Sequence, residues 1–198
     1  MSRRALVVSA ILVVAAVGAW ALFVALPHWY ERKAAKSATA ASGSSTAAPA
    51  PGAPARKIIA TLFYVSADGM SLVAAQRDVP FAPTVVDQAR AIIEAQLAPA
   101  PPLVSAIPSE TRLRSLFVTD RGDAFVDLSA EVSTRHPGGS LEEVFTVYTI
   151  VDALTVNLPA IARVQILVDG KEVDTLAGHV DLRHPLAKSL EWVAHDTH

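Results

Sequence analysis

The 198-residue sequence contains no cysteine, and this absence excludes disulfide bonds, thiolate metal sites, a cysteine nucleophile and a lipid-modified cysteine anchor. It also lacks a phosphate-cradling glycine loop and a dinucleotide-binding fingerprint. Charged residues make up only 18% of the chain, whereas hydrophobic residues reach 52%. This composition indicates that part of the apolar material lies outside a water-exposed globule, so we expect one folded domain with an appendage.

Charge is distributed unevenly along the chain. Residues 1–57 carry seven Lys or Arg and one acid, Glu31, whereas residues 58–198 carry ten Lys or Arg and eighteen Asp or Glu. The C-terminal part therefore has a formal charge of −8. Because phosphate backbones repel such a surface, the sequence argues against nucleic acid as a partner of the folded part.

An uncharged apolar run at residues 5–26 predicts a transmembrane helix in contact with membrane lipid. At about 1.5 Å per residue the run spans ~33 Å, enough to cross a hydrocarbon core of about 30 Å. Trp29 and Tyr30 follow it, as is typical of a membrane–water interface. The alternative is a cleaved signal peptide with small residues near Ala38, although the apolar region of such a peptide is normally shorter.

The orientation is predicted from the size of the C-terminal domain, because the flanking charges nearly balance. Arg3 and Arg4 precede the run, and Arg32, Lys33 and Lys36 follow it. Long C-terminal domains are translocated largely regardless of charge, so we predict a cytoplasmic N-terminus and an extracytoplasmic C-terminal domain. The predicted organisation is a cytoplasmic tail at 1–4, a transmembrane helix at 5–26, a juxtamembrane segment and Ala/Ser/Pro-rich linker at 27–57, a folded domain at 58–186 and a polar tail at 187–198.

The folded part reads as one α/β (α+β) domain. Branched and aromatic residues between turn signals predict strands at 58–66, 72–79, 112–119, 124–128, 163–168 and 171–176. Thr84 and Asp87 form a helix-start signature, and the helix that follows ends before the prolines at 99, 101 and 102. The order β-β-α-β-β-α-β-β predicts a single mixed sheet with two helices on one face.

The second helix is predicted over 140–158, despite many β-branched residues. Ser140 and Glu143 form a capping box, with Ser140 as N-cap. Apolar residues from Leu141 to Leu158 recur at helical spacing. The opposite side of the predicted helix carries Glu142, Thr146, Thr149 and Asp152.

Eight phrases in order carry a resemblance to a known family. They lie at residues 60–65, 91–97, 105–108, 124–129, 139–140, 148–155, 164–170 and 178–182. Together they resemble the GerMN domain of sporulation and spore-germination proteins, over roughly residues 58–186. The resemblance implies a ring-building-motif-like fold and a non-catalytic, membrane-tethered role in bacterial cell-envelope or sporulation assemblies. With the predicted topology, it implies a single-pass protein of the bacterial inner (cytoplasmic) membrane with a periplasmic domain.

The best candidate for hydrolytic chemistry is a group around His136, which lies between Ser129 and Ser140 in the sequence, near Asp127 and Glu131. No Gly-x-Ser-x-Gly elbow frames either serine. Ser140 is better explained as an N-cap and Ser129 as a turn residue that ends a strand. We therefore assign no catalytic residue.

No metal or cofactor site is assigned either. None of the histidines is spaced as in His-Glu-x-x-His, and we expect the terminal pair to be solvated and His179 to have a hydrogen-bonded structural role; the six are His28, His136, His179, His184, His195 and His198. Asp120 and Asp123 bracket a turn and are expected to be solvated. Asp127 lies inside a strand, where acids are disfavoured, and is expected on an exposed sheet face.

Two classes of function remain open. The first is a protein-interaction or scaffold module, whose exposed strand edges could pair with an envelope protein or with a second copy. The second is an envelope enzyme or small-ligand receptor acting on peptidoglycan. Helix caps and turns account for the polar residues considered above. The sequence therefore favours the first class and predicts that the protein is not an enzyme.

Overall fold

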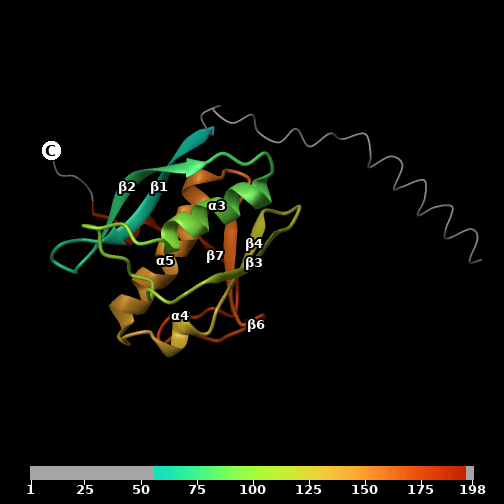
Figure 1. Cartoon of the computed structure of the whole chain (residues 1–198). Helices are drawn as coiled ribbons and strands as arrows, with labels where there is room; N and C mark the ends of the chain where they lie inside the picture. Colours follow the sequence, from blue (N-terminus) through green and yellow to red (C-terminus); the bar gives the residue numbers. More distant parts are fainter. Residues whose placement is uncertain (1–55, 195–198) are drawn as a thin grey trace, which may run out of the picture. The chain divides into compact units, whose positions relative to one another are not determined.

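The computed structural model describes residues 56–194 (Figure 1). The predicted transmembrane helix, the linker and the last four residues lie outside this range. Within it, no helix is both long and apolar enough to cross a membrane.

The described chain folds into two sheets and three α-helices, a mixed α+β architecture. The strands are β1 (Lys57–Val65), β2 (Leu72–Pro80), β3 (Leu113–Val118), β4 (Asp123–Leu128), β5 (Arg163–Val168), β6 (Lys171–Glu172) and β7 (Leu186–Ala187). The helices are α3 (Val85–Leu97), α4 (Glu131–Thr134) and α5 (Ser140–Asn157), followed by the short 3-10 helix η2 (Leu190–Trp192).

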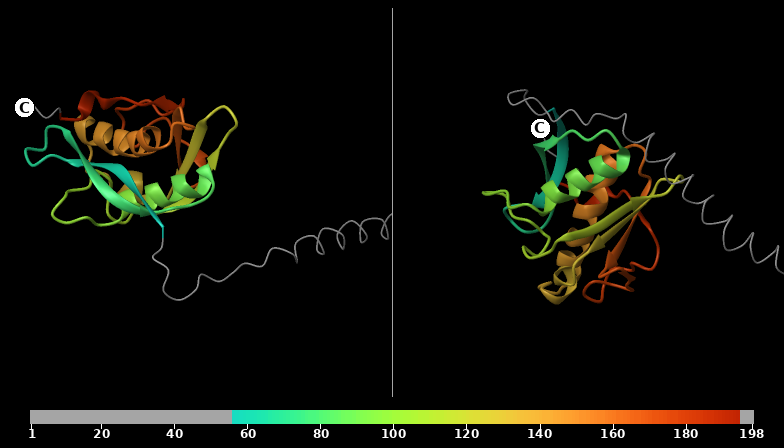
Figure 2. Two further views of the ribbon diagram at one scale, coloured as in Figure 1. Left: turned by 90° about the horizontal axis from the view of Figure 1, so that it is seen from above. Right: turned by 45° about the vertical axis from the view of Figure 1, so that its right-hand side comes forward.

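The prediction of one sheet with helices on a single face is wrong. β1 and β2 form a separate antiparallel hairpin, while β3, β4, β5 and β6 form the main sheet in that order. In the main sheet β4 and β5 are parallel, and α5 is the crossover between them. The helices α3 and α5 contact both sheets and therefore form a layer between them (Figures 1 and 2).

Side-chain carboxamides explain why the hairpin does not join the main sheet. On the edge of β1 that faces away from β2, Phe63 donates to Gln96 Oε1 at 2.9 Å and accepts from Gln96 Nε2 at 2.8 Å. Asn157 makes the same pair of bonds with Thr61, at 2.8 and 2.7 Å. These amides take the place of a neighbouring strand, so β1 has no free edge at Thr61 and Phe63.

A third carboxamide holds the far end of the hairpin to α3. Gln88 Oε1 accepts from the backbone N–H of Ala82 at 2.8 Å, and its Nε2 donates to Pro80 O at 3.1 Å. The helix begins as predicted, because Thr84 Oγ1 accepts from the backbone N–H of Asp87 at 3.1 Å. Polar side chains thus attach the hairpin to the helices, in addition to apolar residues such as Leu62 and Tyr64 that are buried in the core.

Helix α5 is buried on nearly all sides because it lies between the two sheets. Thr146, Thr149 and Asp152, predicted on the polar side of the helix, are each 0% exposed. The predicted capping box is also wrong: the N-cap is Gly139, and no side chain caps the helix. Glu143 does not reach back to the helix start but points into a loop that begins near Leu176.

The C-terminal segment 186–194, here called the strap, is part of the folded domain, although residues from 187 were predicted as a polar tail. β7 pairs with β5 at Arg163 and Val164. The strap then runs alongside α5, shown in red in Figure 2, and Ala194 N donates to Leu72 O at 2.7 Å. The strap therefore ties the main sheet to the hairpin.

Candidate functional site

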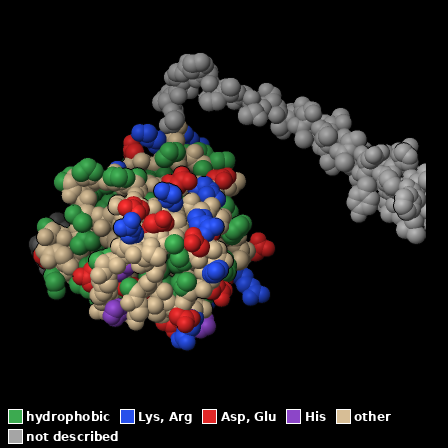
Figure 3. All heavy atoms as spheres, turned by 60° about the horizontal axis from the view of Figure 1, so that its bottom comes forward, with side chains coloured by type: hydrophobic (Ala, Val, Ile, Leu, Met, Phe, Trp, Pro, Cys, Tyr) green, Lys and Arg blue, Asp and Glu red, His purple; other side chains and the backbone are tan. Residues whose placement is uncertain are grey.

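The surface carries an open, mostly apolar groove of about 590 Å³. It lies where the loop after α3 meets the chain after α4, and five of its lining residues are prolines: Pro99, Pro101, Pro102, Pro108 and Pro137. A smaller pocket of about 230 Å³ shares Ser105, Ala106 and Pro137 with it and extends it towards the hairpin turn at 66–71. Figure 3 shows uncharged side chains gathered at this end of the molecule, on the left, and charged ones towards the middle and right.

Backbone and buried hydrogen bonds fix the groove wall. Val65 N donates to Val104 O at 2.8 Å, which attaches the loop to the end of β1. Thr146, in α5, donates from Oγ1 to Ala106 O at 2.7 Å. His136 Nε2 lies 3.1 Å from Thr146 Oγ1, and its Nδ1 accepts from the Gly138 N–H at 3.0 Å. Because Nδ1 accepts, the proton of the neutral ring is on Nε2, which donates to Thr146.

The structure does not assemble the hydrolase group considered from the sequence. His136 contacts Thr146 and Gly138 rather than either serine. Ser129 Oγ accepts from Arg112 N at 3.0 Å, and its hydrogen bond to Glu131 lowers the pKa of that carboxyl. A serine–histidine pair needs the two side chains within hydrogen-bond reach of each other, and the contacts of His136 include neither Ser129 nor Ser140.

We expect a His136→Ala variant to lose about 1 kcal/mol of unfolding free energy, because it removes the hydrogen bonds to Thr146 and Gly138. Urea unfolding of the full-length chain in detergent, followed by circular dichroism, measures this loss. A variant that kept full stability but lost an enzymatic activity would instead favour a catalytic role for His136.

The groove offers apolar contact rather than reactive groups. Its cation, Arg135, is exposed and lies 3.4 Å from Glu110. Glu142 contributes a carboxylate to the smaller pocket. Two large apolar residues stand exposed next to these walls, Val104 at 61% and Met70 at 69%. Exposed apolar residues clustered beside an apolar groove are typical of surfaces that bind other molecules.

Comparison with known proteins identifies the family. The sequence profile of the Germane family, described as sporulation and spore germination, matches residues 61–174, more than half of the chain. The chain belongs to the Germane family. The match runs from β1 to just beyond β6 and confirms the GerMN resemblance seen in the sequence.

Three solved structures are similar to this Germane chain. The tandem GerMN domains of the sporulation protein GerM from Bacillus subtilis are 17% identical, with a TM-score of 0.52 over 67% of this chain and 46% of theirs. The first GerMN domain of that protein is 14% identical, with a TM-score of 0.45 over 66% of this chain and 95% of its own. A protein from Clostridium perfringens, described as a candidate lipoprotein, is 25% identical, with a TM-score of 0.49 over 67% of this chain and 88% of its own. No curated protein matches the sequence significantly.

One of the two acids of the described domain that are 0% exposed, Glu143, has a structural role. Its carboxylate accepts from the backbone N–H groups of Leu176, Ala177 and His179 at 2.8, 3.0 and 2.7 Å. His179 Nδ1 lies 3.2 Å from the same carboxylate, in line with the hydrogen-bonded role predicted for this histidine. Burial raises the pKa of Glu143, but backbone donors, including Ala177 and His179, outweigh it, so the net shift is downward. The carboxylate is therefore ionised and fully engaged.

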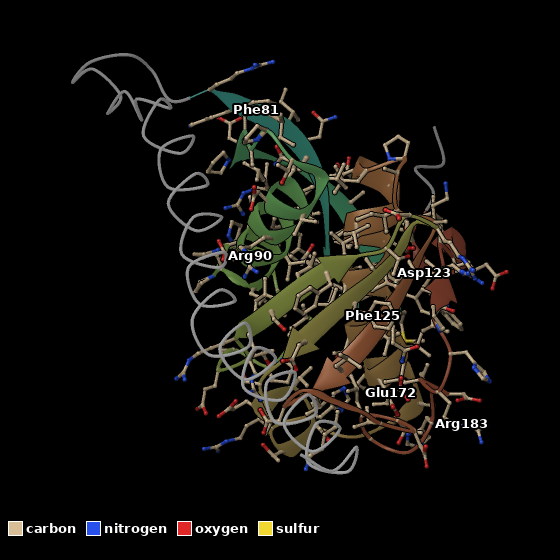
Figure 4. The ribbon with its side chains drawn as sticks, turned by 90° about the vertical axis from the view of Figure 1, so that its right-hand side faces the viewer. Phe81, Arg90, Asp123, Phe125, Glu172 and Arg183 are labelled. Carbon is tan, nitrogen blue, oxygen red and sulfur yellow. The ribbon has the colours of Figure 1, made fainter. Side chains whose placement is uncertain are left out.

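Two further acids of the Germane domain differ from expectation. Asp127 is only 6% exposed, and its Oδ1 accepts from the Gly170 N–H at 2.7 Å, so it holds the turn between β5 and β6. Asp123 forms a bidentate pair with Arg163, at 2.8 and 3.2 Å, rather than being solvated. Figure 4 views this outer face of the main sheet, with Asp123 at one end of β4 and Phe125 along the strand. The predicted exposed position of Asp127 is thus wrong, because the neighbouring turn folds over it.

The histidines do not converge. His136 and His179 have the structural contacts given above, and His184 is exposed. Over residues 56–194, no three His, Asp or Glu side chains are grouped so that they could hold a metal ion. His28, His195 and His198 lie outside the described residues.

Proposed function

We propose that this Germane domain is a non-catalytic protein-interaction module, held outside the bacterial inner membrane by the apolar run at residues 5–26. In this proposal the chain is a single-pass protein with a cytoplasmic N-terminus and a periplasmic domain. Its partner is an envelope protein or a second copy of the chain. The observation that carries the proposal is the apolar groove of about 590 Å³ with its exposed neighbours Met70 and Val104.

The contacts of the polar residues also support a non-catalytic role. The buried acids and amides that could have formed a reactive centre bind backbone groups instead, as Glu143 and Gln96 do. A surface with apolar walls and few charges gains binding energy from excluding water, which suits a protein partner. The domain belongs to a family described as sporulation and spore germination. This description refers to a cellular process and not to a chemical reaction.

A matched pair of substitutions tests the groove as the binding surface. Met70 and Ile59 are both 69% exposed, but Met70 lies beside the groove and Ile59 lies towards the other end of β1. A photo-crosslinking residue at Val104 of the full-length protein, in its native membrane, should capture one defined envelope protein. We expect Met70→Asp to reduce that capture about tenfold, a typical effect of one interface anchor, and Ile59→Asp to leave it unchanged.

The outcomes separate the two classes of function. Equal loss of capture with both variants, or no captured protein, would contradict an interaction surface at the groove. Hydrolysis of cell-wall fragments by the purified full-length protein, reduced by Met70→Asp, would favour the alternative, an envelope enzyme or small-ligand receptor acting on peptidoglycan.

A further inference from the structure

The strap crosses a buried acid of α5. Asp152 is 0% exposed, and its Oδ1 accepts from the backbone N–H of Ser189 at 3.0 Å. Its second oxygen, Oδ2, receives no hydrogen bond from the part of the chain that the structure describes. A buried carboxylate with one unsatisfied oxygen is costly to ionise.

The surroundings of Asp152 supply little compensating charge. Burial raises the pKa of Asp152 to about 6, and the Ser189 N–H and the charge of Lys188 offset this only in part. The pKa of Tyr148, one turn earlier in α5, is also raised, by burial and then by Asp152 and Glu191. The facing groups are therefore one cation and one acid from the strap and a neutral phenol from the helix.

The strap is held by short backbone pairings at its two ends, by Trp192 and Val193 packed against the core, and by one side-chain hydrogen bond. Its first residues pair with β5 over two positions only, Leu186 and Ala187. Its last described residues bond to Leu72, at the start of β2. Between these ends the hydrogen bond that a side chain makes with the strap, among the residues described, is the one that Asp152 accepts from Ser189 N–H.

We propose that the strap is a proton-controlled latch, which stays closed over α5 while Asp152 is protonated and opens more often once Asp152 is ionised. Opening lets water reach the carboxylate, so the ionised group favours the open state. The proton leaves to the solvent. Opening also frees the Leu72 carbonyl and the β5 edge at Val164, the strand edges that the strap covers.

The sign of the pH dependence follows from linkage. A group whose pKa is higher in the closed state than in the open state stabilises the closed state at low pH. That stabilisation is lost as the pH rises past the raised pKa of Asp152. Taking about 4 for the open state, the open fraction should rise about tenfold between about pH 5 and about pH 8.

Hydrogen exchange of the full-length chain in detergent tests the latch. The readout is the protection factor of the strap amides, which is the intrinsic exchange rate at each pH divided by the observed rate, with the β4 amides around Val126 as a reference for global unfolding. We expect strap protection to lie below β4 protection at every pH and to fall about tenfold between about pH 5 and about pH 8. In Asp152→Asn the strap should lose this pH dependence, whereas Asp120→Asn, at an exposed turn, should keep it.

A second variant tests whether the pKa of Asp152 sets the pH at which the strap opens. Lys188 lowers the pKa of Asp152, so Lys188→Gln should move the transition to higher pH. This result would decide the matter even if Asp152→Asn failed to fold. Strap protection that does not depend on pH, an unchanged pH dependence in Asp152→Asn, an unshifted transition in Lys188→Gln, or strap protection equal to that of the β4 amides would each overturn the proposal.

Discussion

Replacement of Glu143 by alanine is expected to destabilise the domain by about 4 kcal/mol. The substitution leaves the backbone N–H groups of Leu176, Ala177 and His179 without their acceptor, and each unsatisfied buried donor costs about 1–3 kcal/mol. Relaxation of the loop should recover part of that sum. The measurement is the urea-unfolding free energy of the full-length chain in detergent.

The adjacent residue provides a matched control. Glu142 is an exposed acid in the same helical turn, so Glu142→Ala should change stability by less than about 0.5 kcal/mol. Glu143→Gln keeps one acceptor oxygen and should lie between the two alanine variants. Comparable losses from Glu142→Ala and Glu143→Ala would mean that helix-terminal charge, and not the loop contacts, accounts for the effect.

The pH dependence of the same residue has a defined sign. Because the pKa of Glu143 is lower in the folded state, its contribution to stability is complete above the unfolded pKa and is lost as the pH falls through the folded value. The difference between wild type and Glu143→Gln should therefore shrink in acid, below about pH 4. A difference that stays constant down to about pH 2 would contradict a lowered pKa.

Replacement of Gln96 by alanine is the second change with a large expected effect. Gln96 is 0% exposed and satisfies both backbone groups of Phe63. Alanine leaves the N–H and the C=O of Phe63 buried without partners and creates a cavity, so we expect a loss of about 3 kcal/mol. The hairpin should lose hydrogen-exchange protection before the main sheet does, because Gln96 links it to α3.

An exposed glutamine of the β1–β2 hairpin is the control. Gln76→Ala, in β2, should cost less than about 0.5 kcal/mol, since that side chain is exposed. If Gln96→Ala changed neither the global stability nor the hydrogen-exchange rate of the Phe63 amide, the hairpin would not depend on its carboxamide contacts.

Local pattern was sufficient to predict most of the strands and both long helices. The branched and aromatic residues of 58–66 and the turn at Asp169 and Gly170 lie where a strand and a turn occur. Gln96 was visible as a polar residue on a largely apolar helical face, which is the signal that could have predicted its contact with β1. Periodicity thus marks a polar side chain that is out of place, but it does not identify the partner.

The errors share one physical cause, which is that α5 contacts two sheets. A helix with one buried face has a polar stripe in water, and Thr149 and Asp152 were assigned to such a stripe. Between two sheets both stripes are buried, and polar residues there must find tertiary partners. Glu143 fits the spacing of a capping box, yet the loop at 176–179, more than thirty residues later, offers it stronger bonds. A rule based on local sequence cannot predict this outcome, because the loop that binds Glu143 is distant in the sequence.

The edge bonds of β1 also determine how the domain would respond to force. A pull through the linker would enter at Lys57, at one end of β1, while the groove lies at the other end, beside Val65. Between these points β1 is bonded to β2 along one edge and to Asn157 and Gln96 along the other. Because those bonds run across the strand, a load along it would shear them together instead of unzipping them one by one. A partner gripping the groove would thus pull against the most mechanically resistant direction of the hairpin.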